Sequence, residues 1–454
     1  MKKYVKPTIQ LTSLQNPSPY EGMKYGLLEE ETIDNVPIQQ IVRDHGSPVF
    51  VLSEKKLREK YQQFYDTFKS EYEKLVIGYS YKTNYLSTVC QILQQEGAWA
   101  EVVSGLEYEM AERLNVPGDH IIFNGCYKKP HELKKAILKN SIINVDSYDE
   151  MIQIEKIAIQ LQKKIKIGLR INMNLTAAPW SKFGINLESG QAYEFCKRLY
   201  NSGVLKICGL HVHIATYIYD PILYSQAATQ LASFASRLEE EFRFKIEYFD
   251  LGGGFPSENT LQSQFLPASY LVPKLSTYAK ALCEPLKKFK SRYHIKPLLI
   301  LEPGRALIDE AISCICTVVA TKKISSSNQG VVIDAGINIL PNCNWYDHDI
   351  YCIGKKEMSR LDTVIFGPLC MQIDVVRKHI KLPPLHRGEH LLIKNTGAYN
   401  ITQSTQFIYE RPAIVLVGEG RVDVIRRAET IDDIKRLESI PDRLFIKDKM
   451  KKAA

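Results

Sequence analysis

Residues 76–102 read VIGYSYKTNYLSTVCQILQQEGAWAEV, and the fold prediction starts from this stretch. A short apolar run, Val76–Ser80, is followed by a helix-like segment, Thr83–Gln95, and then by a second apolar run, Ala98–Val102. Two apolar strands joined by an amphipathic helix are typical of a parallel β-α-β unit. The stretch therefore predicts two neighbouring parallel strands with their connecting helix.

The same alternation continues along the chain. Further apolar runs are Ile121–Phe123, Ile142–Val145, Ile165–Ile171, Ile207–Val212, Ile246–Leu251 and Leu298–Leu301. The helix-like segments between them are Glu107–Leu114, His131–Leu138, Glu150–Gln162, Tyr193–Asn201, Ser225–Phe242 and Ala268–Arg292. Eight strands that alternate with helices predict a closed (β/α)8 barrel of the TIM type. An open doubly wound sheet is the alternative, although such a sheet rarely needs eight regular units.

The pattern changes after Glu302, because turn residues instead of helices now separate the apolar runs. These runs are Ile312–Ala320, Gly330–Ile333, Thr363–Phe366, Leu391–Ile393, Ile414–Val417 and Val422–Ile425. They predict a second, mainly antiparallel β-barrel domain. A short strand at Pro48–Leu52 can join this domain. We therefore expect an N-terminal segment over residues 1–52, the (β/α)8 barrel over 53–310 and the β domain over 311–454.

Composition narrows the class of protein. The 454 residues are 45% hydrophobic and 24% charged, which excludes a disordered or low-complexity chain. The net charge of +8 is dispersed, with no arginine-rich stripe that would indicate nucleic-acid binding. The ten cysteines lack zinc-ligand spacing and suit a reducing compartment. No secretory signal is visible and no stretch reaches the ~18 apolar residues of a membrane span, so we expect a cytoplasmic protein without a metal site.

Polar residues stand where the predicted barrel strands end, which is where barrel enzymes place their chemistry. These residues are Lys82, Glu101, Asn124, Asp146, Arg170, His213, Gly252 and Glu302. A lysine there can form a Schiff base with an aldehyde, although an exposed loop is the commoner place for a lysine.

The loops after the seventh and eighth strands predict a phosphate site. Residues 250–255 read DLGGGF and residues 302–305 read EPGR, which bring glycines and an arginine to the two loops where barrels frequently bind phosphate. A lysine, a phosphate site and a carboxylate in one barrel mouth together suggest pyridoxal phosphate. Glu302 would then lie beside the pyridine nitrogen and His213 would stack on the ring, whereas His211 is expected to be a core residue.

At these positions the chain resembles the fold-type III pyridoxal-phosphate decarboxylases, the group of diaminopimelate, ornithine and arginine decarboxylases. The resemblance runs from about Gly46 to Ile434. Its motifs are Tyr81–Asn84, Glu101–Ser104, Ser181–Gly184, His213–Thr216, Asp250–Phe255, Glu302–Arg305, Gly367–Cys370 with Asp374, Gly397–Tyr399 and Ile425–Thr430.

The resemblance implies pyridoxal 5′-phosphate as the cofactor and a homodimer with shared active sites. The residues that it implies as catalytic are Lys82, Cys370, His213 and Glu302. Those that it implies as cofactor-binding are Lys82, His213, Thr216, Gly253, Gly254, Glu302, Gly304, Arg305 and Tyr399. Lys82 would bind the cofactor aldehyde, and Cys370 of the other subunit would return a proton to Cα. Arg170 would line the pocket, and Lys182 would pair with Asp374 between subunits.

The resemblance also bears on the substrate. Diaminopimelate decarboxylases have an arginine for the distal carboxylate where alignment places Asn342, and a glutamate for the distal ammonium where this chain has Met371. Ornithine-type enzymes have an aspartate in place of Met371, but they share Asp347, which faces the distal ammonium. The uncharged Met371 suits a less charged, larger side chain. We therefore expect a carboxy-lyase that decarboxylates a modified (acylated or carrier-linked) or basic diamino L-amino acid in a biosynthetic pathway.

Other functions stay open. A decarboxylase of free ornithine or lysine, or a diaminopimelate decarboxylase, is the alternative within the same chemistry. A racemase would need a ring nitrogen without its proton, and Glu302 argues against that. An inactive partner-binding homologue should have lost Lys82 or Cys370, and the chain retains both.

Overall fold

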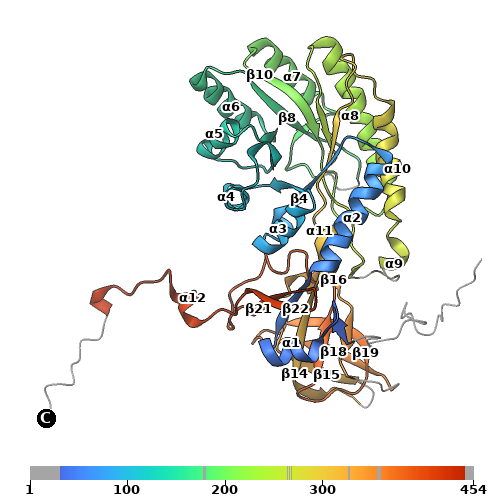
Figure 1. Ribbon diagram of the computed structural model, residues 1–454, viewed down its shortest axis with the longest axis vertical. Helices are drawn as coiled ribbons and strands as arrows, with labels where there is room; N and C mark the ends of the chain where they lie inside the picture. The colour runs from blue at the N-terminus through green and yellow to red at the C-terminus, as the bar shows by residue number, and fades with distance from the viewer. Residues whose placement is uncertain are drawn as a thin grey trace, which may run out of the picture.

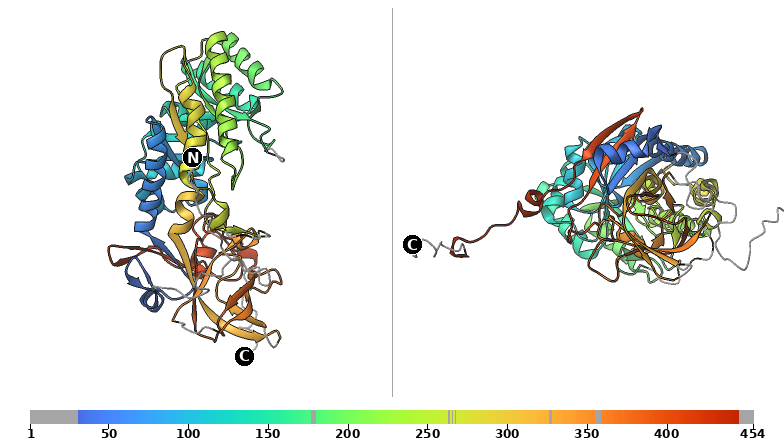
Figure 2. Two further views of the ribbon diagram at one scale, coloured as in Figure 1. Left: turned by 90° about the vertical axis from the view of Figure 1, so that its right-hand side faces the viewer. Right: turned by 90° about the horizontal axis from the view of Figure 1, so that it is seen from below.

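The computed structural model describes residues 31–176, 180–262, 264, 266, 268–325, 328–354 and 359–444. Figure 1 shows two parts, a barrel surrounded by helices above and a β-sheet unit below, and Figure 2 shows the same division from the side.

Eight parallel strands form the barrel, and the pairing of β8 with β10 helps to close it. The strands are β4 (Leu75–Ser80), β5 (Trp99–Val102), β6 (Ile121–Phe123), β7 (Ile142–Val145), β8 (Ile165–Asn172), β10 (Leu205–His211), β11 (Tyr248–Asp250) and β13 (Leu298–Leu301). Each pairs with its neighbours in that order, and β13 returns to β4. The predicted (β/α)8 barrel is confirmed, and every strand ends within two residues of its expected bounds.

Helices cover the outside of the barrel. They are α2 (Glu54–Glu71), α3 (Ser87–Gln95), α4 (Gly105–Arg113), α5 (Pro130–Leu138), α6 (Tyr148–Leu161), α7 (Gln191–Ser202), α8 (Ile222–Glu241), α9 (Ala268–Leu271), α10 (Leu275–Lys288) and α11 (Arg305–Ile308). Three of them begin at a serine, because the hydroxyls of Ser53, Ser104 and Ser147 accept a backbone N–H three residues later. None of the described helices is long and apolar enough to cross a membrane.

Two expected helices differ from the structure. The segment Ala268–Arg292 is two helices, α9 and α10, because Pro273 between them cannot donate a backbone hydrogen bond and restricts the residue before it. The segment expected over Thr83–Gln95 becomes helical only at Ser87. Before it, Tyr81–Thr83 form a 3-10 turn (η1), and the Asn84 side chain donates to the Gly397 carbonyl of the β unit at 2.9 Å. The chain directly after Lys82 is therefore held by the other unit.

The β unit contains a nine-stranded sheet. Its strands are β3 (Val49–Ser53), β14 (Ile312–Lys323), β15 (Asn328–Ile333), β17 (Ile350–Cys352), β18 (Leu361–Phe366), β19 (Val375–Leu382), β20 (His390–Ile393), β21 (Ala413–Gly418) and β22 (Arg421–Arg426). The main path is β19-β18-β15-β14-β3-β21-β22, and β20 pairs with both β14 and β17. Most pairs are antiparallel, as expected, but β15–β18 and β3–β21 are parallel. The predicted strands did not include β17 or β19.

Short elements complete the described chain. They are β1 (Thr32–Ile33), β2 (Val36–Pro37), α1 (Ile38–His45), β9 (Ile185–Asn186), β12 (Thr260–Leu261), β16 (Tyr346–Asp347) and α12 (Ile431–Lys435). The antiparallel pair β12–β16 lies between the barrel and the β unit. Strand β12 follows the glycines of residues 252–254 in the barrel, and β16 follows β15 of the β unit in the chain. After β22 the chain leaves the body, and α12 lies apart from both units (Figure 1).

Strand β3 is the expected strand at Pro48–Leu52, and it lies inside the sheet between β14 and β21. Phe50 and Leu52 pack in the main core, whereas Val49 and Val51 pack in a second core beneath α1. A strand with both faces covered reads as a continuous apolar run, as residues 49–52 do. Burying each such side chain contributes about 1.5–3 kcal/mol. The division of the chain after residues 52 and 310 stays a prediction.

Candidate active site

Lys82 follows the end of β4 and points at the carboxylate of Glu101, near the end of β5. Its Nζ donates to Glu101 Oε2 and to Ser80 Oγ, at 2.6 Å each. Burial alone would lower the Lys82 pKa, but Glu101 foremost, with Tyr399 and Glu302, raises this pKa above its ordinary value. The amine is thus held as a cation, with a buried base in contact to receive its proton.

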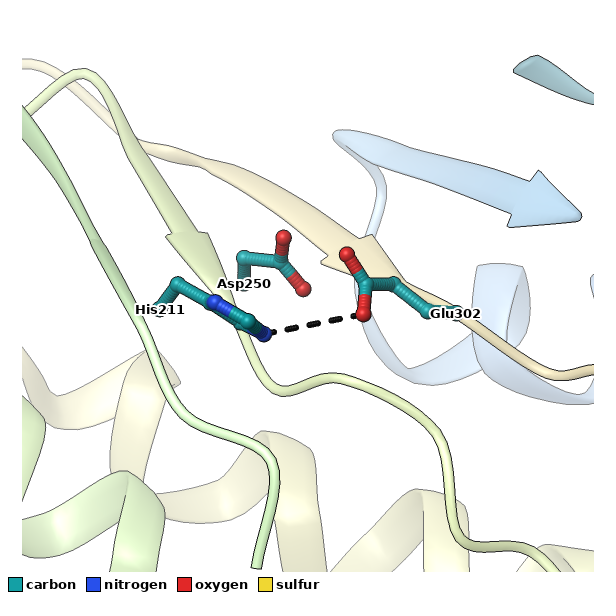
Figure 3. Close-up of side chains that lie close together, drawn as sticks. All are labelled: His211, Asp250 and Glu302. Carbon is teal, nitrogen blue, oxygen red and sulfur yellow. Dashed lines mark ion pairs between the residues drawn. The ribbon is translucent and has the colours of Figure 1, made fainter. Parts of the chain in front are cut away.

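Glu302 is a buried anion just beyond β13. Asn124 Nδ2 donates to Glu302 Oε1 at 2.5 Å and to Glu101 Oε1 at 3.1 Å, so it links two strand ends. His211 Nε2 lies 3.6 Å from Glu302 Oε2, and Asp250 faces the same carboxylate (Figure 3). His211 is buried, as expected from the sequence, and from there it contacts Glu302.

The two neighbouring carboxyl groups, Asp250 and Glu302, differ in ionisation. Burial and the Glu302 charge raise the pKa of Asp250 well above its ordinary value. Burial would also raise the Glu302 pKa, but His211 and a hydrogen bond from Asp250 hold the Glu302 pKa below its usual range. Asp250 is therefore the acid and Glu302 the anion. With His211 they place ligand atoms within 4.8 Å of one another, around the negative charge of Glu302.

His213 lies two residues beyond β10 as a neutral ring. Burial foremost, with the nearby charges of Lys82 and Arg170, lowers the pKa of His213 to about 3. Gly253 N donates to His213 Nδ1 at 3.0 Å, which leaves the ring proton on Nε2. The Trp180 ring stacks on His213 with 5.4 Å between centroids. Trp180 was not predicted as a site residue, and its only signal in the sequence was its place one residue before the Ser181–Gly184 motif.

The glycines form a cradle that side chains would fill. A Cβ on Gly253 would overlap the Glu302 carbonyl, one on Gly254 the Ala215 carbonyl, and one on Gly304 the Thr83 hydroxyl. Gly254 also has a φ of +96°, which disfavours other residues. Backbone N–H groups can therefore approach an anion closely here.

Arg305 provides the positive charge of this cradle. Its guanidinium lies over the rings of Tyr217, Tyr346 and Tyr399, at 4.6, 5.4 and 5.0 Å from their centroids. Nη1 donates to Tyr346 OH at 3.0 Å. Asp309 is 3.9 Å away, but its carboxylate already accepts three other hydrogen bonds. Burial would lower the Arg305 pKa, yet these tyrosines and Asp309 raise it, so the guanidinium stays charged and can take an anion. The roles of Tyr217 and Tyr346 were not predicted.

Arg170 and Asp347, two further predicted substrate residues, each pair with an oppositely charged side chain. Arg170 Nη1 pairs with Asp146 Oδ1 at 3.2 Å, and its guanidinium lies 4.5 Å from the centre of the Phe183 ring. Asp347 ends β16, and the Arg377 Nε lies 3.7 Å from its Oδ1. Nothing in the sequence pattern indicated Arg377, because the 29 residues between Asp347 and Arg377 carry no regular spacing.

The remaining predicted residues lie away from this cluster. Cys370 and Met371 are exposed in the loop between β18 and β19, and no hydrogen bond or ion pair joins them to the barrel mouth in the part of the chain that the structure describes. Thr216 is exposed in the loop after β10. Asp374 accepts from Ile337 N at 2.8 Å and from Leu369 N at 2.7 Å. Because both of its oxygens are engaged within the chain, its pairing with Lys182 stays a prediction.

The arrangement fits pyridoxal phosphate. Neither His211 ring nitrogen nor the Thr83 hydroxyl has a hydrogen-bond partner among the described residues, although all are buried. The cluster at Glu302 attracts a cation such as a pyridinium, the glycine cradle with Arg305 attracts a phosphate, and Lys82 stands between them as the amine. The eight strand ends named from the sequence thus meet in one mouth.

Comparisons with known proteins agree with this fit. Residues 54–309 match the family model "Pyridoxal-dependent decarboxylase, pyridoxal binding domain". The chain is similar to the diaminopimelate decarboxylase of Aquifex aeolicus, with 29% identity over 93% of this chain and 98% of the relative. It is 30% identical to that of Methanothermobacter thermautotrophicus, over 89% of this chain and 95% of the relative.

The fold agrees as well. The crystal structure of diaminopimelate decarboxylase from M. jannaschii in complex with L-lysine superposes with a TM-score of 0.83 and 29% identity, over 91% of this chain and 96% of that one. The chain therefore belongs to the pyridoxal-dependent decarboxylases, and it is a pyridoxal-phosphate-dependent amino-acid carboxy-lyase.

Proposed function

We propose that this chain decarboxylates the α-carbon of a small free amino acid of the diaminopimelate class. The observation that carries the proposal is its similarity to diaminopimelate decarboxylases over nearly the full length of both chains. This similarity supports the alternative named from the sequence and does not support the acylated or carrier-linked substrate suggested by Met371.

Pyridoxal phosphate, when bound, supplies a ring that takes up the electron pair left at Cα when carbon dioxide departs. Lys82 must lose a proton before its Nζ can bond to an aldehyde carbon, and Glu101 Oε2 lies 2.6 Å away to take that proton. Glu302 would hold the ring nitrogen protonated, and neutral His213 would present a flat face to the ring. Arg305 and the backbone of the glycine cradle would hold the phosphate.

The proton that returns to Cα is assigned to Cys370 of a second copy. Among the described residues, no hydrogen bond or ion pair joins its loop to the barrel mouth of its own chain. Asp374 accepts from Leu369 N within the loop, and Cys370 is exposed. In a homodimer, this loop of each subunit would bring Cys370 and Met371 to the active site of the other subunit. We propose this dimer as the active form.

The distal end of the substrate pocket differs from the charged pattern expected of diaminopimelate decarboxylases. Asn342 is buried, and its Nδ2 donates to the Ala398 carbonyl at 2.5 Å, so it offers no charge to a ligand. Met371 is uncharged. Of the three distal positions considered, Asn342, Met371 and Asp347, Asp347 is the one with an anionic side chain.

The test is a substrate panel with the purified protein loaded with pyridoxal phosphate. We expect carbon dioxide release from meso-diaminopimelate to exceed release from L-lysine, L-ornithine, L-arginine and Nε-acetyl-L-lysine, and to vanish in Lys82→Ala. Faster release from the acetylated substrate would refute the free-substrate proposal. Faster release from ornithine or lysine would make the chain a decarboxylase of simple basic amino acids.

A further inference from the structure

The short strand β16 places a carboxylate beside the cofactor cradle. Tyr346, its first residue, is buried and accepts a hydrogen bond from Arg305, the proposed phosphate ligand. Asp347 comes next, pairs across the β-ladder with Thr260, and its side chain is 33% exposed. Asp347 is therefore one residue away from a side chain that contacts the cradle arginine.

A guanidinium from another strand lies against this carboxylate. Arg377 of β19 places Nε 3.7 Å from Asp347 Oδ1, and its side chain is only 9% exposed. Arg377 Nε donates to the His379 carbonyl at 3.0 Å, and Nη1 donates to the His348 carbonyl at 2.9 Å. Two backbone acceptors thus fix the guanidinium in place without cancelling its charge.

We call Asp347 and Arg377 the rim. Together they favour a different distal group of the substrate from the one that Asp347 alone would favour. An isolated carboxylate would favour a lone distal ammonium, as in ornithine or lysine. A carboxylate with a fixed guanidinium beside it has no net charge and offers one partner to an ammonium and another to a carboxylate. A distal amino-acid end carries both groups, and an arginine binds a carboxylate through directed, charge-assisted hydrogen bonds.

We propose that Arg377 is a specificity-determining residue that balances Asp347, so that the rim accepts a zwitterionic distal end and discriminates against a lone ammonium. This inference rests on the proposed function. It identifies Arg377 of β19 as the charge that selects substrates of the diaminopimelate class. Specificity then comes from repulsion of the wrong substrate as well as attraction of the right one.

The test compares kcat/KM for meso-diaminopimelate with kcat/KM for L-lysine in Arg377→Met holoenzyme. We expect the ratio to fall by at least about 10-fold, because one charge-assisted contact is lost to diaminopimelate while repulsion of the lysine ammonium is relieved. Both values come from one preparation, so a partly unfolded variant does not alter their ratio. Arg377→Lys, which keeps the charge without the two carbonyl contacts, should retain most of the ratio.

Lys381→Met is the matched control. Lys381 lies on the same strand and pairs across the β-ladder with Asp362, so its loss changes the net charge equally without touching β16. The ratio should stay at the wild-type value in this variant. An equal loss of both activities in Arg377→Met, with the ratio unchanged, would show a purely structural role and overturn the inference.

Failure of the proposed function is a separate result. If the wild-type enzyme releases no carbon dioxide from diaminopimelate, the proposed function is refuted. The charge role is then tested by binding of L-lysine and L-norleucine to the holoenzyme, followed by the visible absorbance of its cofactor. The distal end of L-lysine is a lone ammonium, whereas that of L-norleucine is an uncharged methyl group. Arg377→Met must tighten L-lysine relative to L-norleucine by a similar factor, and no change in that preference would overturn the role of Arg377.

Discussion

Two adjacent buried carboxyl groups, Asp250 and Glu302, should respond in opposite ways to the same chemical change. Replacing each by its amide removes the ability to carry a negative charge and preserves the size of the side chain. Because Asp250 is the protonated member and Glu302 the ionised one, Asp250→Asn should be tolerated and Glu302→Gln should not.

The expected magnitudes follow from the contacts. Asp250 Oδ1 accepts from Gly252 N at 2.9 Å, and Oδ2 accepts from Asn144 Nδ2 at 3.1 Å. An asparagine keeps the first bond and a donor toward Glu302, and it loses the second bond, which is worth about 1 kcal/mol or less than ~10-fold in rate. Glu302→Gln removes a buried charge that would pair with the ring nitrogen, which costs about 3–5 kcal/mol or roughly 10²–10⁴-fold.

The assay is kcat/KM for decarboxylation at saturating cofactor, with thermal unfolding of each variant to verify that it is folded. The two amides serve as each other's control, since they make equal changes a few ångströms apart. Equal losses of activity, or a larger loss in Asp250→Asn, would refute the assignment of the proton to Asp250.

Three further predictions use other parts of the structure. Lys82→Ala and Cys370→Ala should each be inactive alone. If the subunits share sites, a mixture of the two variants should recover up to ~25% of wild-type activity, because half of the dimers are mixed and each has one intact site. No recovery would contradict the shared sites. Gly304→Ala should weaken cofactor binding by about 10–100-fold, because its Cβ would overlap the Thr83 side chain beside Lys82. The affinity is measured by an absorbance titration, and an unchanged affinity would show that the cradle is not needed. Burial raises the pKa of Glu107 to about 7 from 4.5, so its protonated form stabilises the fold at low pH, and this contribution is lost as the pH rises toward and through 7. In urea unfolding, the wild type should therefore lose stability relative to Glu107→Gln between pH 5 and pH 8. An equal difference in stability between the two proteins at both pH values would contradict the raised pKa of Glu107.

The barrel was predictable because its strands are buried on both faces. Runs such as Ile165–Ile171 are almost continuously apolar, and a closed parallel sheet brings all strand ends to one mouth. The strand-end residues Lys82 and Glu101 could therefore be expected to meet before their 2.6 Å contact was seen.

Strand β19 was missed for the opposite reason. It is an edge strand, and Lys378 and His379 are exposed along it, so no apolar run marks it in the sequence. Arg377 was missed with it, since the contact with Asp347 depends on how two distant strands pack. Pro273, by contrast, is a visible signal of the break between α9 and α10. The helical periodicity of the segment outweighed this signal in the prediction.

The position of β3 in the sheet has a consequence for how the protein is made. This strand leaves the ribosome before any part of the barrel, but its two partners, β14 and β21, are synthesised only after the barrel is complete. Until then both of its edges are unpaired and its apolar faces uncovered, which is the condition that promotes aggregation of nascent chains. A chain that stops before Ala413 would leave one edge of β3 exposed permanently. Chaperone demand during synthesis should therefore be set by the first strand of the sheet rather than by the larger barrel.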